Sequence, residues 1–274
     1  MRESMTAIAR VRRFSSDAVC GIINQVDSVD VRLLPDETIE DLQNGYRIIA
    51  HPEVFAYGTD AVLLAHFART QGAERAADLG AGSGILPLLM CARNPELSMI
   101  GIEIQPRLAD MARRSVELNG LEERVRIVCG DLKEASRLAG HGLDLVVSNP
   151  PYERADAGKP SGRAHVDIAK REVCCTLQDV VSAAAKLLRT GGRLCMIHRA
   201  ERFAELMQRM REARVEPKRA RLVSRRADEA PGFALVEGRK GAGPGMAFMP
   251  QLVLYGPDGA YTAGLREIYG IGEA

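Results

Sequence analysis

The chain has 274 residues, of which 46% are hydrophobic, and its 37 basic and 36 acidic residues leave a formal net charge of +1. This length allows one or two domains, and this composition can fill a sizeable core. The chain has no run of 18 apolar residues and no charged-then-apolar leader, so the sequence indicates neither a membrane span nor secretion. We therefore expect a cytoplasmic protein.

The six cysteines form no C-x-x-C pair and lie mostly in apolar surroundings, which favours packing in the core over zinc ligation or disulfides. The sequence therefore predicts no metal site. The cysteines are Cys20, Cys91, Cys129, Cys174, Cys175 and Cys195.

Basic residues gather between Arg199 and Arg226, where ten lysines and arginines stand against four glutamates, a local charge of +6. A run of this kind is usually a solvated face of the protein. Contact with RNA phosphates is the alternative, and the sequence leaves the two interpretations open.

The chain divides into three parts by its pattern. Residues 1–28 have no sustained period and form an unpatterned extension with several arginines, for which we expect loose attachment. Residues 29–70 predict a hairpin and a helix that pack on the core. Residues 71–274 predict a single α/β domain with a parallel sheet.

The predicted hairpin joins residues 38–43 to residues 46–49 through Asn44-Gly45, a dipeptide that suits a tight turn because both central residues need positive φ. An apolar helix over residues 61–67 follows. Thr59 or Asp60 is a credible N-cap for it, and the free amides of its first turn can receive a ligand carboxylate. An ordinary capped helix explains these residues equally well.

A glycine-rich turn follows the next strand, which begins at Ala76. The segment Asp78-Leu79-Gly80-Ala81-Gly82-Ser83-Gly84 leads into a predicted helix over residues 85–93. Glycines allow the backbone to approach a ligand closely at a helix N-terminus. The spacing G-x-G-x-G differs from the G-x-G-x-x-G of dinucleotide-binding proteins, so the sequence disfavours a nicotinamide cofactor.

Two further acids end the next two predicted strands. Glu103 closes the strand over residues 99–103 and can accept hydrogen bonds from both hydroxyls of a ribose. A helix over residues 106–119 and a strand over residues 124–128 lead to Asp131, which can accept from an adenine amino group. Each acid alone is explained as a helix cap. Acids at three successive strand ends around a glycine-rich turn favour a nucleoside-containing ligand.

The apolar run over residues 143–148 predicts a buried parallel strand, and Asn149-Pro150-Pro151-Tyr152 follows it directly. In an open α/β sheet, ligands bind at the carboxyl ends of the strands. The Asn149 side-chain oxygen and the Pro150 carbonyl can orient the hydrogens of a planar amino or amide group, and Tyr152 can stack on its plane. A Pro-Pro turn with a capping asparagine is the alternative.

The rest of the chain continues the α/β pattern. A polar loop over residues 153–166 precedes a helix that runs through Leu188. Further segments predict a strand over residues 193–197, a helix over 200–213, strands over 218–224 and 233–239, and an edge strand over 249–255.

These motifs resemble those of class I S-adenosylmethionine-dependent methyltransferases that methylate planar amino or amide nitrogens. Residues 31–270 resemble the bacterial family that N6-methylates the adenine at position 37 of a valine tRNA. The phrases that carry this closer resemblance are Gly58-Thr59-Asp60-Ala61-Val62-Leu63-Leu64, Asn149-Pro150-Pro151-Tyr152 and Leu235-Val236-Glu237-Gly238-Arg239-Lys240-Gly241.

The resemblance implies a Rossmann-like, seven-stranded, mostly parallel sheet with helices on both faces. It implies catalytic roles for Asn149, Pro150 and Tyr152. A tRNA substrate implies phosphate contacts from Lys159, Arg163, Lys170, Arg171, Arg239 and Lys240. The residues implied for S-adenosylmethionine are Thr59, Asp60, Asp78, Gly80, Gly82, Gly84, Glu103, Asp131, Leu132 and Asn149.

Two alternative functions remain at this point. A glutamine-N5 methyltransferase acting on peptide release factors uses the same Asn-Pro-Pro-Tyr logic, because a glutamine amide is also planar. That family carries an N-terminal helical domain, where this sequence predicts a hairpin and one helix. A non-catalytic RNA-binding protein on a methyltransferase fold is the second alternative, and the intact Glu103, Asp131 and Asn149 disfavour it.

Overall fold

The computed structural model describes residues 31–42, 45–52, 58–152 and 175–271. The predicted extension over residues 1–28 and the polar loop over 153–166 lie outside the described residues. Four of the candidate tRNA contacts lie outside them as well, namely Lys159, Arg163, Lys170 and Arg171.

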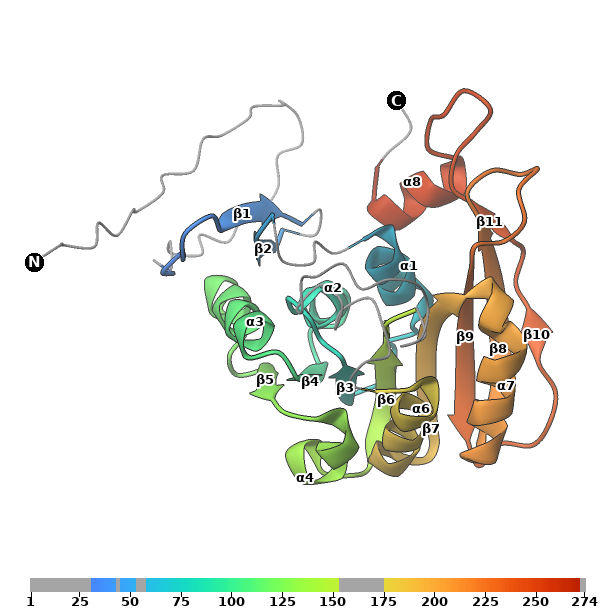
Figure 1. The fold of residues 1–274 in the computed structure, drawn as a ribbon, viewed down its shortest axis with the longest axis horizontal. Coiled ribbons are helices and arrows are strands. Elements are labelled where there is room, and N and C mark those ends of the chain that lie inside the picture. The colour runs from blue at the N-terminus through green and yellow to red at the C-terminus, as the bar shows by residue number, and fades with distance from the viewer. Residues whose placement is uncertain (1–30, 43–44, 53–57, 153–174, 272–274) are drawn as a thin grey trace, which may run out of the picture.

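A sheet of nine strands forms the centre of the protein, in the order β10-β8-β9-β7-β6-β3-β4-β5, with β11 also pairing with β8. It runs from β5 at one end to β10 at the other (Figure 1). All of its pairs are parallel except those that β9 makes with β7 and β8. Its strands are β3 (Arg75–Leu79), β4 (Ser98–Glu103), β5 (Val125–Cys129), β6 (Leu143–Ser148), β7 (Leu188–Arg199), β8 (Val215–Ser224), β9 (Phe233–Lys240), β10 (Ala247–Phe248) and β11 (Leu252–Val253).

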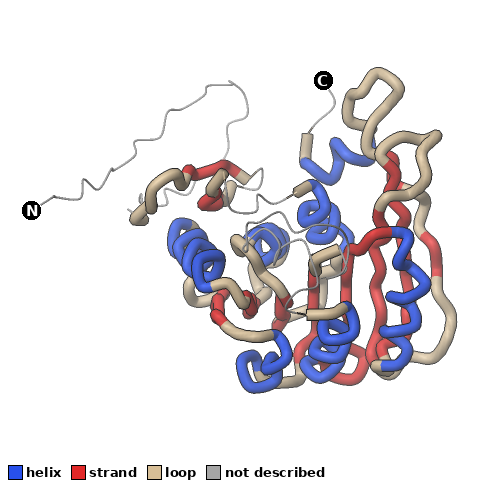
Figure 2. Tube along the Cα trace, viewed as in Figure 1, coloured by secondary structure: helices blue, strands red, loops and turns tan. Residues whose placement is uncertain are grey.

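Helices flank this layer of strands, as Figure 2 shows. Alternate residues of β6 separate two apolar clusters: Leu145 and Val147 pack with α1, α2, α3 and α8, whereas Val146 packs with α4, α6 and α7. Because side chains alternate across a strand, this division places helices on both faces of the sheet. The helices are α1 (Thr59–Phe67), α2 (Ile85–Arg93), α3 (Pro106–Leu118), α4 (Ala135–Ala139), α6 (Leu177–Leu187), α7 (Phe203–Glu212) and α8 (Ala263–Tyr269), with short 3₁₀ turns η1 (Leu132–Glu134) and η2 (Ala200–Arg202).

The predicted hairpin is confirmed as β1 (Thr38–Asp41) and β2 (Arg47–Ala50), which pair antiparallel. Its second strand lies along α3. The Asn119 Oδ1 atom accepts from the Arg47 amide at 2.7 Å, and the buried Ser115 hydroxyl accepts from the Ile49 amide at 3.0 Å. Buried amides that find partners on another element hold the hairpin against α3.

Three expectations about local structure are wrong. Gly58 is the N-cap of α1, and neither Thr59 nor Asp60 caps it, because helical residues begin at Thr59. Strand β7 begins at Leu188, five residues before the expected start, although its pairing with β6 passes from Leu188 directly to Arg193 across an irregularity that contains Gly191-Gly192. The expected edge strand over residues 249–255 forms only at Leu252–Val253, as β11, and a second short strand, β10, precedes the expected range at Ala247–Phe248. Pro250 lies between them, and a proline cannot donate to a ladder.

The fold class is confirmed: seven strands, β3 to β9, form a mostly parallel sheet to which the two short strands are added. Among the described residues, no helix combines the length and apolar character that a membrane span requires.

Candidate active site

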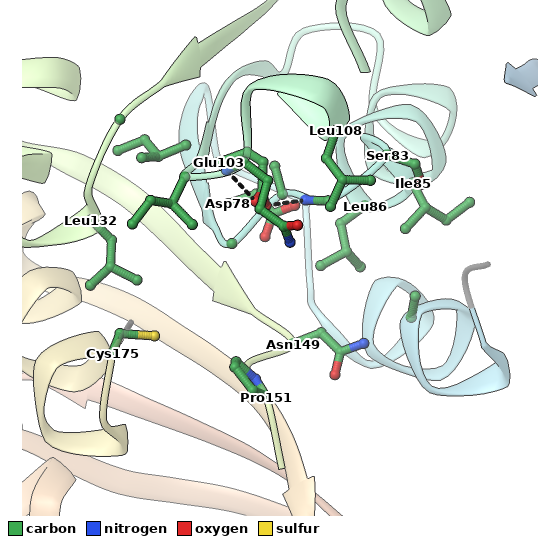
Figure 3. Close-up of a pocket in the computed structure, with 18 of the residues that line it drawn as sticks. Asp78, Ser83, Ile85, Leu86, Glu103, Leu108, Leu132, Asn149, Pro151 and Cys175 are labelled. Atoms are coloured by element: carbon green, nitrogen blue, oxygen red, sulfur yellow. Dashed lines mark hydrogen bonds between the residues drawn. The ribbon is translucent and has the colours of Figure 1, made fainter. Parts of the chain in front are cut away.

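A pocket opens at the carboxyl ends of β3, β4, β5 and β6, where the sequence places its acids and its asparagine (Figure 3). Side chains from four successive strand ends therefore meet in one place, as expected for an open α/β sheet. Its lining includes seven residues predicted to bind the cofactor: Asp78, Gly80, Gly82, Glu103, Asp131, Leu132 and Asn149.

The glycine turn forms one wall of the pocket. Gly80 and Gly82 have φ values of +83° and +55°, which favour glycine. The Gly80 and Ala81 amides both donate to the Ile102 carbonyl, at 2.9 and 3.0 Å, so β4 fixes the turn. A Cβ atom added at Gly80 or Gly82 would meet no protein atom within 4 Å. Because both residues line the pocket, the absence of these side chains leaves space for a ligand along the backbone.

Asp78 and Glu103 lie at the pocket floor with different surroundings. Glu103 is 5% exposed, and its two carboxylate oxygens accept from the Gly82 amide at 2.8 Å and the Gln105 amide at 2.9 Å. Burial raises the pKa of Glu103, and these amide bonds oppose the rise. Asp78 is fully buried, and neither of its oxygens has a partner among the described residues. Burial, followed by the nearby Glu103 charge, raises the pKa of Asp78 well above its ordinary value.

Asp131 follows the end of β5 and lines the pocket from that strand, which β4 separates from the strand that leads into the glycine turn. Its Oδ1 atom accepts from the Lys133 amide at 2.9 Å and so caps η1. The cap interpretation is therefore correct, and the same residue also lines the pocket. A carboxylate has about four acceptor positions, so a cap bond leaves capacity for a ligand donor. The neighbouring Leu132 is 8% exposed and supplies an apolar wall.

Asn149 and Pro151 line the pocket, while Pro150 between them is buried. Ser148, the last residue of β6, donates its hydroxyl hydrogen to the Leu79 carbonyl at 2.6 Å. This bond ties the end of β6 to the end of β3, so the start of the Asn149 motif is fixed relative to the glycine turn. The Tyr152 hydroxyl oxygen lies within hydrogen-bonding distance of both Asn149 Oδ1 and Asp60 Oδ2.

The Tyr152 ring contacts three side chains, of which only Arg199 was singled out from the sequence, as part of the basic stretch, whereas His198 and Phe233 were missed. His198 meets it edge-on with ring centroids 5.6 Å apart, Phe233 lies tilted at 5.4 Å, and the Arg199 guanidinium carbon lies 5.5 Å from its centroid. These residues come from the end of β7 and the start of β9, which pair with each other. The predicted strands place these residues near the strand ends where the pocket lies. The strands do not indicate that they contact Tyr152.

His198 is fully buried beside Tyr152. Its Nδ1 atom accepts from the Arg199 amide at 2.8 Å, and its Nε2 atom has no partner among the described residues. Burial, assisted by the charge of Arg202, lowers the pKa of His198 to about 4. His198 is therefore neutral at physiological pH, with its proton on Nε2.

Three predicted cofactor residues lie outside the pocket lining. Thr59 accepts from the Tyr269 hydroxyl at 3.3 Å, and Asp60 accepts from Tyr152 at 2.5 Å. A Cβ added at Gly84 would lie 3.2 Å from the Ala112 Cβ, so the absence of a side chain there allows α2 to approach α3. A cofactor role for these three residues stays a prediction.

Two of the predicted phosphate contacts, Arg239 and Lys240, lie among the described residues, and the structure places them away from the pocket. Arg239 donates to the Gly191 carbonyl at 3.0 Å, and Lys240 donates to the Ala185 and Leu188 carbonyls at 2.7 and 2.8 Å. Because β9 runs antiparallel to β7, its carboxyl end lies at the sheet edge opposite the pocket.

Several members of the Arg199–Arg226 stretch form ion pairs on α7 and β8 or beside them. Arg209 and Arg211 are partly exposed, which fits a solvated face, whereas Arg202 and Arg219 are largely buried. The pairs are Arg202–Glu205, Arg209–Glu212, Arg211–Glu216 and Arg219–Glu237.

Other pocket residues had no signal in the sequence. Ala61 and Leu108 reach it from the first turns of α1 and α3, and Cys175 reaches it from the segment before α6. These are small or apolar residues in positions that any core could occupy. Only the three-dimensional packing of α1 and α3 against the strand ends assigns them to the pocket.

The chain was compared with known proteins. The family model "Methyltransferase small domain" matches residues 45–214. A tRNA1(Val) (adenine(37)-N6)-methyltransferase from Porphyromonas gingivalis is 31% identical over 156 residues, which are 54% of this chain and 60% of the relative. The enzyme of the same name from Yersinia pseudotuberculosis is 34% identical over 142 residues, or 51% of this chain and 55% of the relative. The matches thus span little more than half the length of these curated relatives.

Solved structures show the same fold. A predicted O-methyltransferase from Agrobacterium tumefaciens superposes with a TM-score of 0.61 and 25% identity over 77% of this chain and 95% of that chain. A putative class I S-adenosylmethionine-dependent methyltransferase from Listeria monocytogenes has a TM-score of 0.50 and 13% identity, covering 78% and 68% of the two chains. The family model covers more than half of the sequence, and the fold agrees with it. The chain belongs to the methyltransferase small domain family.

Proposed function

We propose that this protein transfers a methyl group from S-adenosylmethionine to N6 of an adenine in tRNA, at position 37 of a valine tRNA. The observation that carries the proposal is that Asn149 lines the same pocket as Glu103 and Asp131. A group that orients an amine and groups that recognise a nucleoside therefore share one cavity. The names of the relatives support the choice of adenine in tRNA.

The pocket residues fit S-adenosylmethionine. When bound, this cofactor supplies an electrophilic methyl group on a sulfonium. Glu103 would accept from the ribose hydroxyls and Asp131 from the adenine amino group, with Leu132 against the adenine ring. The glycine turn at Gly80 and Gly82 leaves space for the methionine part. The partnerless carboxylate of Asp78 at the pocket floor also suits a ligand with positive charge.

The acceptor side is built to hold an amine. An exocyclic amine is a poor nucleophile because its lone pair is delocalised into the ring. Acceptors at Asn149 Oδ1 and the Pro150 carbonyl would hold its two hydrogens and favour a more pyramidal nitrogen. Most of the rate would then come from proximity and alignment. No side chain has to remove a proton first, because the nitrogen becomes acidic once alkylated and loses its proton to water.

A base within structured RNA has to be extruded before it can reach such a pocket. Tyr152, Phe233 and Arg199 lie together beside Asn149, and the Arg199 guanidinium carbon is 4.9 Å from the Phe233 ring centroid. Arg199 forms no ion pair among the described residues. Within the Arg199–Arg226 stretch, it is the member that lies against the acceptor motif, so we assign it contact with a phosphate of the extruded nucleotide.

The test is transfer of labelled methyl from S-adenosylmethionine to bulk tRNA and, in parallel, to a peptide release factor, followed by nucleoside analysis. We expect label in tRNA, recovered as N6-methyladenosine, and its loss when the valine tRNA is absent. Label in the release factor alone would replace this proposal with glutamine methylation. If the protein binds the cofactor but transfers methyl to neither substrate, it is either a non-catalytic RNA-binding protein or an enzyme with another methyl acceptor.

A further inference from the structure

The side chains of Asp60 and Asn149 both approach the hydroxyl of Tyr152. The Tyr152 oxygen lies 2.5 Å from Asp60 Oδ2 and is also within hydrogen-bonding distance of Asn149 Oδ1. A phenol has one proton, so it cannot donate to the carboxylate and to the amide oxygen at the same time. One of the two contacts must therefore have another donor.

Two arrangements satisfy the geometry. In the first, the phenol donates to Asn149 Oδ1, and its lone pairs face the Asp60 carboxylate, which is repulsive. In the second, the phenol donates to Asp60, and the Asn149 amide is rotated by a half turn so that its NH₂ donates to the phenol oxygen. A hydrogen bond to a charged acceptor is roughly twice as strong as one between neutral groups. The second arrangement is therefore favoured.

The surroundings keep all three groups in place. The second Asp60 oxygen, Oδ1, accepts from the Ala61 amide at 3.0 Å in the first turn of α1, where the helix dipole stabilises negative charge. Burial and the Asp60 charge raise the pKa of Tyr152 well above its ordinary value, so the phenol keeps its proton. His198 and Phe233 hold the ring from its sides.

We propose that Asp60 is a positioning residue that acts through Tyr152: it orients the Asn149 amide so that Oδ1, and not the NH₂ group, faces the acceptor amine. The proposal rests on the proposed function for what the amide binds. The orientation of the amide itself depends only on the three side chains. This role of Asp60 differs from the cofactor contact that the family resemblance implies for it.

The first variant is Asp60→Asn, which keeps the shape of the side chain but adds a donor. An amide at residue 60 can donate to the phenol oxygen and release the phenol proton toward Asn149 Oδ1, so Asn149 turns its NH₂ group to the acceptor. We expect kcat to fall about 10- to 100-fold, the usual scale for a misaligned reacting group. The dissociation constant for S-adenosylmethionine should stay within about twofold, since the affected amide faces the other substrate.

The second variant, Tyr152→Phe, removes the relay. Asp60→Asn should then have no further effect on kcat, so the double-mutant cycle shows strong coupling. A role for Asp60 in folding or in binding the cofactor would persist without the Tyr152 hydroxyl. Asp258→Asn is the matched control: Asp258 lies in an exposed turn where it accepts from the Ala260 amide at 3.0 Å, a bond that asparagine retains.

A readout besides activity is the side-chain amide resonance of Asn149, which is simple to assign because the chain has only five asparagines. In protein labelled with [¹⁵N]asparagine, Asp60→Asn should shift this resonance, and the same change in a Tyr152→Phe background should not. An unmoved resonance overturns the proposal, and so does a raised cofactor dissociation constant with kcat unchanged. If the wild type methylates no tRNA but the resonance responds as expected, the proposed function fails and the orientation by Asp60 stands.

Discussion

The carboxyl groups of Asp78 and Glu103 lie together at the floor of the pocket, and only Glu103 has hydrogen-bond donors among the described residues (Figure 3). The two acids end or nearly end adjacent parallel strands, β3 and β4. Two buried carboxyl groups this close cannot both ionise without a cost. In the protein without its ligand, backbone amides therefore stabilise the ionised form of Glu103, whereas nothing among the described residues stabilises the ionised form of Asp78.

Asp78→Asn should stabilise the protein free of ligand. The pKa of Asp78 is raised in the folded state, so its contribution to stability is present below the pKa of the unfolded chain and is lost as pH rises through the folded-state pKa. Asparagine has no such loss. The increase in Tm should therefore grow between acidic and neutral pH, by roughly 2–4 °C for each kcal/mol of relieved charge.

The measurement is thermal unfolding across that pH range, with Asp228→Asn as the control, because Asp228 lies in an exposed turn. The control should give the same small difference at every pH. A Tm difference for Asp78→Asn that stays constant with pH would mean that Asp78 keeps its charge with a partner.

Glu103→Gln should weaken binding of S-adenosylmethionine. Glutamine can still accept one of the two backbone amides but has lost the charge-assisted acceptor for a ribose hydroxyl. Hydrogen bonds to charged groups contribute about 1.5–3 kcal/mol, so we expect the dissociation constant to rise at least about tenfold. Isothermal titration calorimetry measures it, with the exposed Glu117→Gln on α3 as the control. An unchanged constant would remove Glu103 from the ribose site.

Asn149→Ala should separate acceptor orientation from cofactor binding. Methyl transfer should fall below detection while affinity for S-adenosylmethionine stays within a few-fold, because the lost amide serves the acceptor amine. Single-turnover transfer and equilibrium binding of the cofactor measure the two effects on the same preparation. Loss of both together would place Asn149 in the cofactor site.

Strand ends were the part of the site that the sequence could predict. The apolar runs before Asp78, Glu103 and Asn149 are short and bounded, and parallel strands bring their carboxyl ends to one edge. Side-chain partners across that edge could not be predicted. Tyr152 contacts His198 and Phe233, which are far from it in the sequence, and these contacts depend on the register between β6, β7 and β9.

The start of α1 could not be predicted from the preferences of residue types for the N-cap position. Thr59 and Asp60 are typical N-caps, yet α1 begins one residue earlier with Gly58 as its cap, and Asp60 instead accepts from Tyr152. The other Asp60 oxygen, Oδ1, still accepts from the Ala61 amide, so Asp60 links the first turn of α1 to Tyr152. The same interaction distinguishes Asp60 from an ordinary helix cap.

Gly101→Ala should destabilise the fold and disturb the glycine turn together. A Cβ at residue 101 of β4 would lie 2.7 Å from Ile127 Cδ1 and 2.9 Å from Ala81 Cβ. Such overpacking costs about 1–3 kcal/mol, and Ala81 belongs to the turn that lines the pocket. We expect a lower Tm and a higher dissociation constant for S-adenosylmethionine in the same variant.

Gly243→Ala is the matched control for this change, because an added Cβ there meets no atom within 4 Å and its φ lies outside the left-handed region. It should leave binding unchanged and stability unchanged or slightly raised, since alanine has less conformational freedom in the unfolded chain. If Gly101→Ala lowers Tm but not affinity, the turn can shift without affecting the pocket. Gly101 would then serve only the packing of β4 against Ile127, and the close contact between β4 and the turn would have no part in binding.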